Sequence, residues 1–173
     1  ELPVLSIYSY MLISDGKALV VDPCRDISFF LEVAEKEGVA IIGVYLTHSH
    51  ADFVAGHMEL VKRVNCPIYQ SHKSGAQYPF KPVKEGTEIR VGKALVKFIE
   101  TPGHTPDGMC ALVYGPENPN VPELMLTGDV LFVGSVGRPD LMGGAASAAW
   151  LAGAFFDSWQ NKISMVGDGV KIF

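Results

Sequence analysis

One short stretch, Thr47-His48-Ser49-His50-Ala51-Asp52, constrains the fold of this chain more than any other. It places two imidazoles and a carboxylate directly after the apolar run at residues 41–46. An uninterrupted apolar run is typical of a strand buried on both faces, and α/β proteins carry their sites where such strands end. Imidazole and carboxylate groups are ligands for zinc and iron. The stretch therefore predicts a metal site, rather than a polar loop that holds two histidines by chance.

Two further polar groups also follow apolar strands. His104 ends the segment Thr101-Pro102-Gly103-His104, and Asp129 ends Thr127-Gly128-Asp129. Taken singly, His104 fits a satisfied core or loop histidine, and Asp129 fits a turn residue or a helix cap. Adjacent strand ends in a layered sheet protein can bring such side chains together. The recurrence of the pattern favours one shared site.

The hydrophobic pattern predicts an α+β protein with two sheets packed face to face and helices outside them. Asp15-Gly16 between two apolar runs is a hairpin signal. The predicted elements are strands at 7–13 and 18–21, a helix from about 26–28 to 38, a strand at 41–46, a helix at 53–64, strands at 67–70, 87–91, 94–100, 110–114 and 124–126, a helix at 145–162 and a strand at 170–173.

Composition excludes several kinds of partner. The net charge of −5 argues against nucleic acid, because phosphate binding needs a basic surface. No apolar run is long enough to span a membrane, and the first residues do not resemble a signal peptide. The three cysteines, Cys24, Cys66 and Cys110, form no Cys-x-x-Cys pair, which fits reduced thiols in the cytoplasm. We therefore expect a cytoplasmic protein of one domain.

The three polar segments resemble the metal motifs of the metallo-β-lactamase superfamily, in the same order and over essentially the whole chain. Within that superfamily the chain is most similar to persulfide dioxygenases of the bacterial type that is often fused to a rhodanese domain. The longer strings that carry this resemblance are His50-Ala51-Asp52-Phe53-Val54-Ala55-Gly56-His57, Gly128-Asp129-Val130-Leu131-Phe132-Val133-Gly134 and Val136-Gly137-Arg138-Pro139-Asp140-Leu141.

The resemblance implies a four-layer αββα sandwich whose metal lies at one edge of the two sheets. It implies a single Fe²⁺ held by His48, His104 and Asp129, with His50 and Asp52 in supporting catalytic positions. The implied reaction oxidises a low-molecular-weight persulfide, such as glutathione persulfide, with O₂ to sulfite and the parent thiol. Arg138 resembles an arginine of the dioxygenase motif, which binds a substrate carboxylate or orders the active-site loop. A salt bridge to Asp140 is the equally weighted alternative.

A second metal ion fits the sequence poorly. Glyoxalase II, a two-metal relative, uses the residue after the motif aspartate and a late histidine as ligands. Here Phe53 occupies the first position, and no histidine follows His104. A two-histidine, one-carboxylate set with open positions is typical of non-haem Fe(II) oxygenases. The alternatives are a Zn²⁺-dependent thioester hydrolase of the glyoxalase II type and a truncated, non-catalytic metal-binding module.

The family comparison also bears on domains and partners. We expect residues 1–173 to form one C-terminally incomplete metallo-β-lactamase-like domain, because similar proteins usually continue with further structure and then often a rhodanese domain. A rhodanese partner or fused domain is therefore expected. The apolar segment 145–156, together with Trp150 and Trp159, could pack on the core or on a second copy in a homo-oligomer. The roles of His57 and Cys24 and the identity of the thiol carrier stay open.

Overall fold

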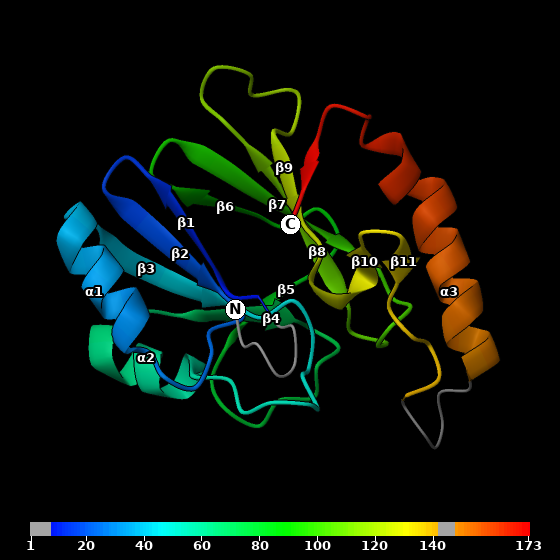
Figure 1. The fold of residues 1–173 in the computed structure, drawn as a ribbon, viewed down its shortest axis with the longest axis horizontal. Coiled ribbons are helices and arrows are strands. Elements are labelled where there is room, and N and C mark those ends of the chain that lie inside the picture. The colour runs from blue at the N-terminus through cyan, green and yellow to red at the C-terminus, as the bar shows by residue number, and fades with distance from the viewer. Residues whose placement is uncertain (1–7, 142–147) are drawn as a thin grey trace.

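The computed structural model describes residues 8–141 and 148–173, which form a four-layer αββα sandwich (Figure 1). One five-stranded sheet has the order β1-β2-β3-β4-β5, and the other has the order β12-β9-β8-β7-β6. Helices α1 and α2 cover the outer face of the first sheet, and α3 covers the outer face of the second. The architecture predicted from the sequence is confirmed.

The first sheet begins with an antiparallel hairpin and continues with parallel strands. Its turn, Asp15-Gly16, has φ of 47° and 73°, which are the left-handed values of a tight hairpin turn. The elements of this half are β1 (Tyr10–Ser14), β2 (Lys17–Val21), α1 (Ser28–Glu37), β3 (Ala40–Tyr45), α2 (His57–Val64), β4 (Ile68–Ser71) and β5 (Lys81–Val83).

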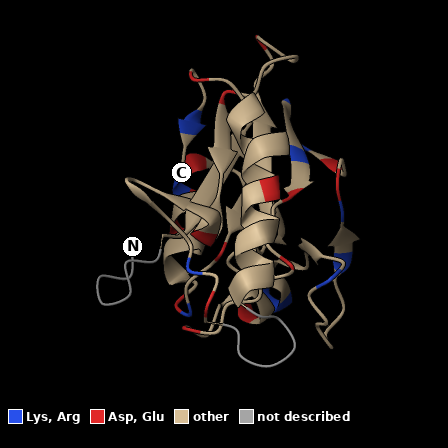
Figure 2. Ribbon diagram, turned by 90° about the vertical axis from the view of Figure 1, so that its right-hand side faces the viewer, with Lys and Arg blue, Asp and Glu red and all other residues tan. Residues whose placement is uncertain are grey.

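The second sheet is antiparallel except for β12, which runs parallel to β9. A small hairpin, β10–β11, lies between this sheet and α3 (Figure 1). Figure 2 looks onto α3, whose described residues include a single charged side chain, Asp157. The elements of this half are β6 (Glu88–Val91), β7 (Ala94–Glu100), β8 (Met109–Tyr114), β9 (Leu124–Leu126), η1 (Gly128–Val130), β10 (Leu131–Phe132), β11 (Ser135–Val136), α3 (Ala148–Asn161), η2 (Ile163–Met165) and β12 (Lys171–Ile172).

Strand β2 shows how one apolar sequence serves two cores. Because side chains alternate along a strand, Leu19 and Val21 enter the core between the sheets, while Ala18 and Val20 pack with α1 and α2. All four are buried. A strand placed between two layers is apolar on both faces, and this explains its unbroken hydrophobic sequence.

Three details differ from the sequence prediction. Helix α2 starts at His57 rather than at residue 53, because Gly56 N–H donates to the carbonyl of Pro23 and a Cβ at Gly56 would lie 2.3 Å from the carbonyl oxygen of Cys24. That contact holds the segment against the loop after β2. Strand β5 and the β10–β11 hairpin lie in segments where the sequence predicted neither a helix nor a strand. The predicted starts of the first strand, at residue 7, and of the last helix, at residue 145, lie outside the described residues. No helix in the described ranges has the length and apolarity needed to cross a membrane.

Candidate metal centre

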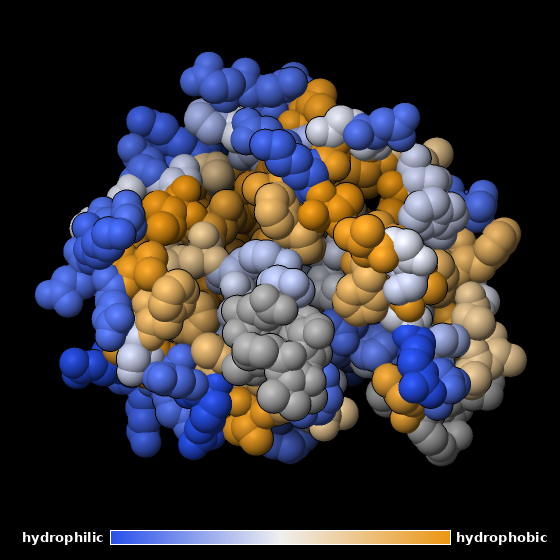
Figure 3. Space-filling model, in the orientation of Figure 1, coloured by the Kyte–Doolittle hydropathy of each residue, from blue (hydrophilic) through white to orange (hydrophobic). Residues whose placement is uncertain are grey.

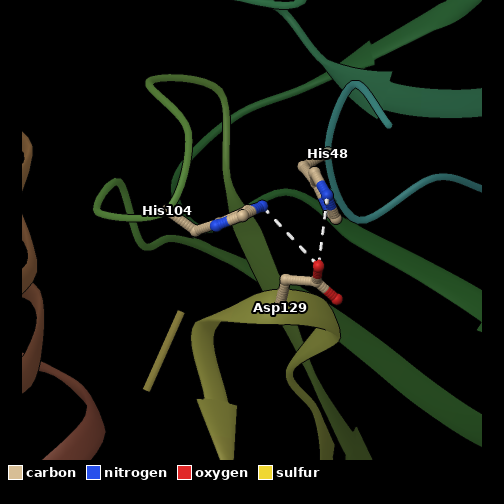
Figure 4. A group of neighbouring side chains, drawn as sticks. All are labelled: His48, His104 and Asp129. Carbon is tan, nitrogen blue, oxygen red and sulfur yellow. Dashed lines mark ion pairs between the residues drawn. The ribbon is translucent and has the colours of Figure 1, made fainter. Parts of the chain in front are cut away.

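Three loops at one edge of the sandwich bring His48, His104 and Asp129 together (Figure 4). His48 follows β3 of the first sheet, whereas His104 follows β7 and Asp129 follows β9 of the second. Asp129 Oδ2 lies 3.9 Å from His48 Nε2 and 3.6 Å from His104 Nε2, and all three ligand atoms lie within 4.8 Å of one another. Metal–nitrogen bonds of about 2.1 Å place neighbouring ligands roughly 3.0–3.5 Å apart. The two distances to Asp129 exceed that range by only about 0.1–0.4 Å.

A backbone carbonyl sets the orientation of the His104 ring. Nδ1 of His104 lies 3.1 Å from the carbonyl oxygen of Arg138, which can only accept a hydrogen bond. In the neutral form of the ring the proton therefore sits on Nδ1, and Nε2 presents its lone pair to the space beside Asp129. Metal-ligating histidines typically make such a bond with the nitrogen that faces away from the ion.

A buried side-chain relay sets the orientation of the His48 ring. The hydroxyl of Thr47 donates to Asp22 Oδ2 at 2.7 Å, so its oxygen accepts from Nδ1 of His48 at 3.0 Å. This again leaves the Nε2 lone pair of His48 directed towards Asp129. Burial, together with the neighbouring His50, lowers the pKa of His48 to about 4. The ring is therefore neutral at pH 7, which is the form that binds a metal.

Asp22 is a residue of the candidate site that the sequence analysis missed. It is buried, has a left-handed φ of 45°, and accepts hydrogen bonds from both the backbone N–H and the hydroxyl of Thr47. Burial opposes its charge, but nearby His50 and the Thr47 bonds outweigh that effect and lower the pKa of Asp22. Asp22 also directly follows an apolar strand, as the three ligand-type residues do. That repeated position was the signal in the sequence.

His50 is directed to Asp22 rather than to the three ligand-type side chains. Its Nε2 lies 2.9 Å from Asp22 Oδ1, and both side chains are about 6% exposed. Burial disfavours the charged ring, but Asp22 raises the pKa of His50 above its usual value. His50 therefore supports the site through Asp22 and not as a member of the ligand cluster.

The other two predicted site residues lie further out. Asp52 is exposed, and it does not belong to the cluster of ligand atoms. The Arg138 guanidinium is 67% exposed and makes a two-pronged contact with Asp140, from Nε at 3.1 Å and from Nη2 at 2.9 Å. Arg138 therefore contacts the site only through its backbone carbonyl, which lies beside His104. Its side chain forms the salt bridge to Asp140 that the sequence analysis gave as the alternative.

A second set of hydrogen-bonded polar side chains links the loop that carries His48 to the loop that carries His104. Asp107 accepts hydrogen bonds from the backbone N–H and the hydroxyl of Ser49, at 3.0 and 2.6 Å. Gln70, at the end of β4, donates to the Ser49 hydroxyl at 3.4 Å and accepts from the Tyr78 hydroxyl at 2.6 Å. Asp107 and Gln70 are both buried. These side chains fix the position of the loop between His48 and His50 relative to the loop of His104.

Aromatic packing occupies the neighbourhood of His50. The ring of Phe53 lies edge-on to His50, with centroids 4.6 Å apart. His57, at the start of α2, faces the ring of Tyr78 at 4.9 Å, and neither of its buried ring nitrogens has a hydrogen-bond partner within the described part of the chain. The His57 side chain therefore packs against an aromatic ring and lies outside the ligand cluster.

A four-layer αββα sandwich with a His/His/Asp site at its edge defines a class of metal-binding proteins. The chain belongs to the Metallo-beta-lactamase superfamily, whose profile matches residues 2–166. A solved metallo-beta-lactamase from Staphylococcus aureus subsp. aureus COL superposes with a TM-score of 0.85 at 30% identity, over 96% of this chain and 55% of that one.

Two other proteins are also similar to this chain. The crystal structure of ETHE1 from Myxococcus xanthus matches with a TM-score of 0.81 at 27% identity, over 96% of this chain and 70% of that one. A hydroxyacylglutathione hydrolase from Hydrogenovibrio crunogenus is 33% identical over 128 residues, which cover 72% of this chain and 43% of the hydrolase. The chain thus spans about half the length of the hydrolase and of the staphylococcal protein.

Proposed function

We propose that the chain binds one Fe²⁺ through Nε2 of His48, Nε2 of His104 and the Asp129 carboxylate, and that it oxidises a persulfide with O₂. One observation carries the proposal: two imidazoles, each with its Nδ1 engaged by a neighbouring oxygen, turn their Nε2 atoms towards a single carboxylate. A two-histidine, one-carboxylate set leaves coordination positions open for substrate and O₂. The donor set fits the ion.

The surroundings of His50 support one ion rather than two. A second ion would need donors beside His50, but His50 is paired with Asp22 and packed against the ring of Phe53. Asp52, the remaining acidic group of the motif, is exposed. A hydrolase that activates water between two ions needs both metal sites. The proposed activity therefore needs only the three ligand-type side chains.

In the proposed reaction, a persulfide RSSH, O₂ and water give the thiol RSH, sulfite and two protons. The outer sulfur is oxidised, O₂ is reduced, and the S–S bond breaks. When bound, the iron supplies the redox chemistry at the sulfur. The chain itself orients the two imidazoles, through Thr47 and through the Arg138 carbonyl, and supplies the carboxylate of Asp129.

Similarity adds to this support. The strings around Phe53, Asp129 and Arg138 resemble persulfide dioxygenases, and the ETHE1 fold matches 96% of the chain.

The test of the proposed function is O₂ uptake by iron-loaded protein supplied with the persulfide of glutathione or of benzyl mercaptan. We expect sulfite as the product and complete loss of uptake in His104→Ala. His72→Ala is the matched control, because His72 pairs with Glu100 away from the site. Absence of uptake with both persulfides, in protein shown to contain iron, would contradict the proposal.

A zinc-dependent thioester hydrolase is the second candidate, and the similarity to a hydroxyacylglutathione hydrolase favours it. It predicts hydrolysis of S-lactoylglutathione without O₂ consumption. Metal analysis of anaerobically purified protein separates the two: one iron per chain without zinc favours the dioxygenase. Iron binding without either reaction would identify the third alternative, a non-catalytic metal-binding module.

A further inference from the structure

A cavity of about 480 Å³ adjoins Asp129 on the side of Asp22 and His50. Its size falls in the range of small-molecule sites. It lies between the start of β1, the end of β9, the residues around β10 and the end of β12. A molecule that placed its sulfur beside Asp129 would have the rest of its body in this cavity.

The wall of the cavity is mostly aromatic and aliphatic. Its apolar members include Tyr8, Tyr10, Leu131, Phe132, Val133 and Phe173. Figure 3 shows apolar side chains gathered around the middle of this face of the molecule, with hydrophilic side chains mostly at its periphery. Such a wall favours a body that leaves water readily.

Charge complementarity points the same way. The acids and the imidazole that line the cavity are Asp22, His50 and Asp129, and none of the described lining residues is a lysine or an arginine. The two stretches outside the described ranges contain no basic residue in the sequence either. The one imidazole among the described lining residues, His50, already contacts the Asp22 carboxylate at 2.9 Å. The nearby Arg138 side chain is paired with Asp140 and does not line the cavity.

We infer that this site takes thiol carriers that are uncharged and apolar next to the sulfur, in preference to glutathione. The inference rests on the proposed function for the identity of the reacting sulfur. Glutathione carries two carboxylates, and a carboxylate that enters this wall loses water without gaining a cationic partner. An aromatic or alkyl thiol loses nothing comparable and gains contact with the tyrosine and phenylalanine rings.

The test measures binding, so that it does not depend on turnover. Iron-loaded protein is titrated calorimetrically, without O₂, with benzyl mercaptan and with glutathione, which share the thiol and differ in the carrier. We expect benzyl mercaptan to bind at least about tenfold more tightly. Equal or tighter binding of glutathione would overturn the inference.

Two lysine substitutions in the β10–β11 hairpin test whether the preference for benzyl mercaptan arises in the cavity. Val133 lines the cavity and is fully exposed, whereas Val136 lies on the other side of the hairpin, in the groove facing α3. Val133→Lys introduces a cation at the cavity wall and should reduce the preference for benzyl mercaptan by about tenfold. Val136→Lys adds the same charge and should leave the preference unchanged. Equal effects of the two substitutions would overturn the assignment of the carrier to this cavity.

The outcome separates this inference from the proposed function. Preferential binding of benzyl mercaptan without O₂ uptake from either persulfide would leave the inference standing and contradict the dioxygenase activity. O₂ uptake with tighter binding of glutathione would do the reverse.

Discussion

The Ser49 hydroxyl donates a 2.6 Å hydrogen bond to Asp107, and this bond joins the loop of the first sheet that carries His48 to the loop of the second sheet that carries His104. The backbone N–H of Ser49 donates to the same carboxylate oxygen at 3.0 Å. One buried carboxylate therefore sets the spacing between two of the proposed ligands.

Asp107→Ala should weaken both the fold and the metal site. The substitution removes the acceptor of two hydrogen bonds from Ser49, which costs about 1–3 kcal/mol of unfolding free energy in total. Loss of a residue that orients ligands typically lowers metal affinity about 10–100-fold. Urea unfolding and chelator competition measure the two effects. Asp140→Ala is the control, because its carboxylate is exposed and contacts Arg138. Comparable effects of the two substitutions would contradict the role of Asp107.

Thr47→Val should lower metal affinity about 10–100-fold with little change in side-chain volume. Valine keeps the shape but removes the hydroxyl that accepts from Nδ1 of His48 and donates to Asp22. Thr47→Ser retains the hydroxyl and should restore most of the affinity, as measured by chelator competition. Failure of serine to restore it would show that the methyl group, and not the hydroxyl, is what matters at this position.

Gly128→Ala should destabilise the protein more than Gly134→Ala does. Both glycines have left-handed φ, 49° and 77°, so both substitutions carry the strain of that conformation, about 1 kcal/mol. Only at Gly128 would the new Cβ meet a neighbour, at 2.4 Å from the Thr47 hydroxyl oxygen. That overlap adds roughly 1–3 kcal/mol and displaces the residue that orients His48. Thermal unfolding and metal binding should therefore both change in Gly128→Ala, and only stability should change in Gly134→Ala.

Glu100 should contribute stability that disappears in acid. Burial opposes its charge, but hydrogen bonds from Lys73 and His72 lower its pKa to about 2, from 4.5. A group with a depressed folded-state pKa stabilises the protein above its unfolded pKa and loses that contribution as pH falls through the folded value. The difference in unfolding free energy between the parent and Glu100→Gln should therefore be full at about pH 6 and vanish near pH 2. The exposed Glu117→Gln should show no such trend. A pH-independent difference for Glu100→Gln would contradict the prediction.

The sequence predicted the layers and the ligand-type residues because both depend on local patterns. The unbroken apolar sequence of β2 and β3 reflects burial on two faces, and Asp15-Gly16 has few alternatives to a hairpin turn. His48, His104 and Asp129 were found because each follows a strand, and strand ends in this architecture meet at one edge.

The residues that orient those side chains were harder to find. Asp107 stands in a turn, where aspartate is common for local reasons, so only the folded structure distinguishes it from an ordinary turn residue. Asp22 follows an apolar strand, but its bonds to Thr47 appear only in the folded structure. Strand β5 and the β10–β11 hairpin are three residues or fewer per strand, too short for a periodic pattern to register. The cavity wall combines residues from opposite ends of the chain, Tyr8 and Phe173, which no local pattern relates.

His48 belongs to one sheet, and His104 and Asp129 belong to the other. An ion bound to all three side chains would therefore link the two sheets of the sandwich at their shared edge. Metal binding and folding are then coupled, because an unfolded chain cannot hold the three ligand groups in place. Each tenfold rise in free metal above the dissociation constant should add about 1.4 kcal/mol to the free energy of unfolding.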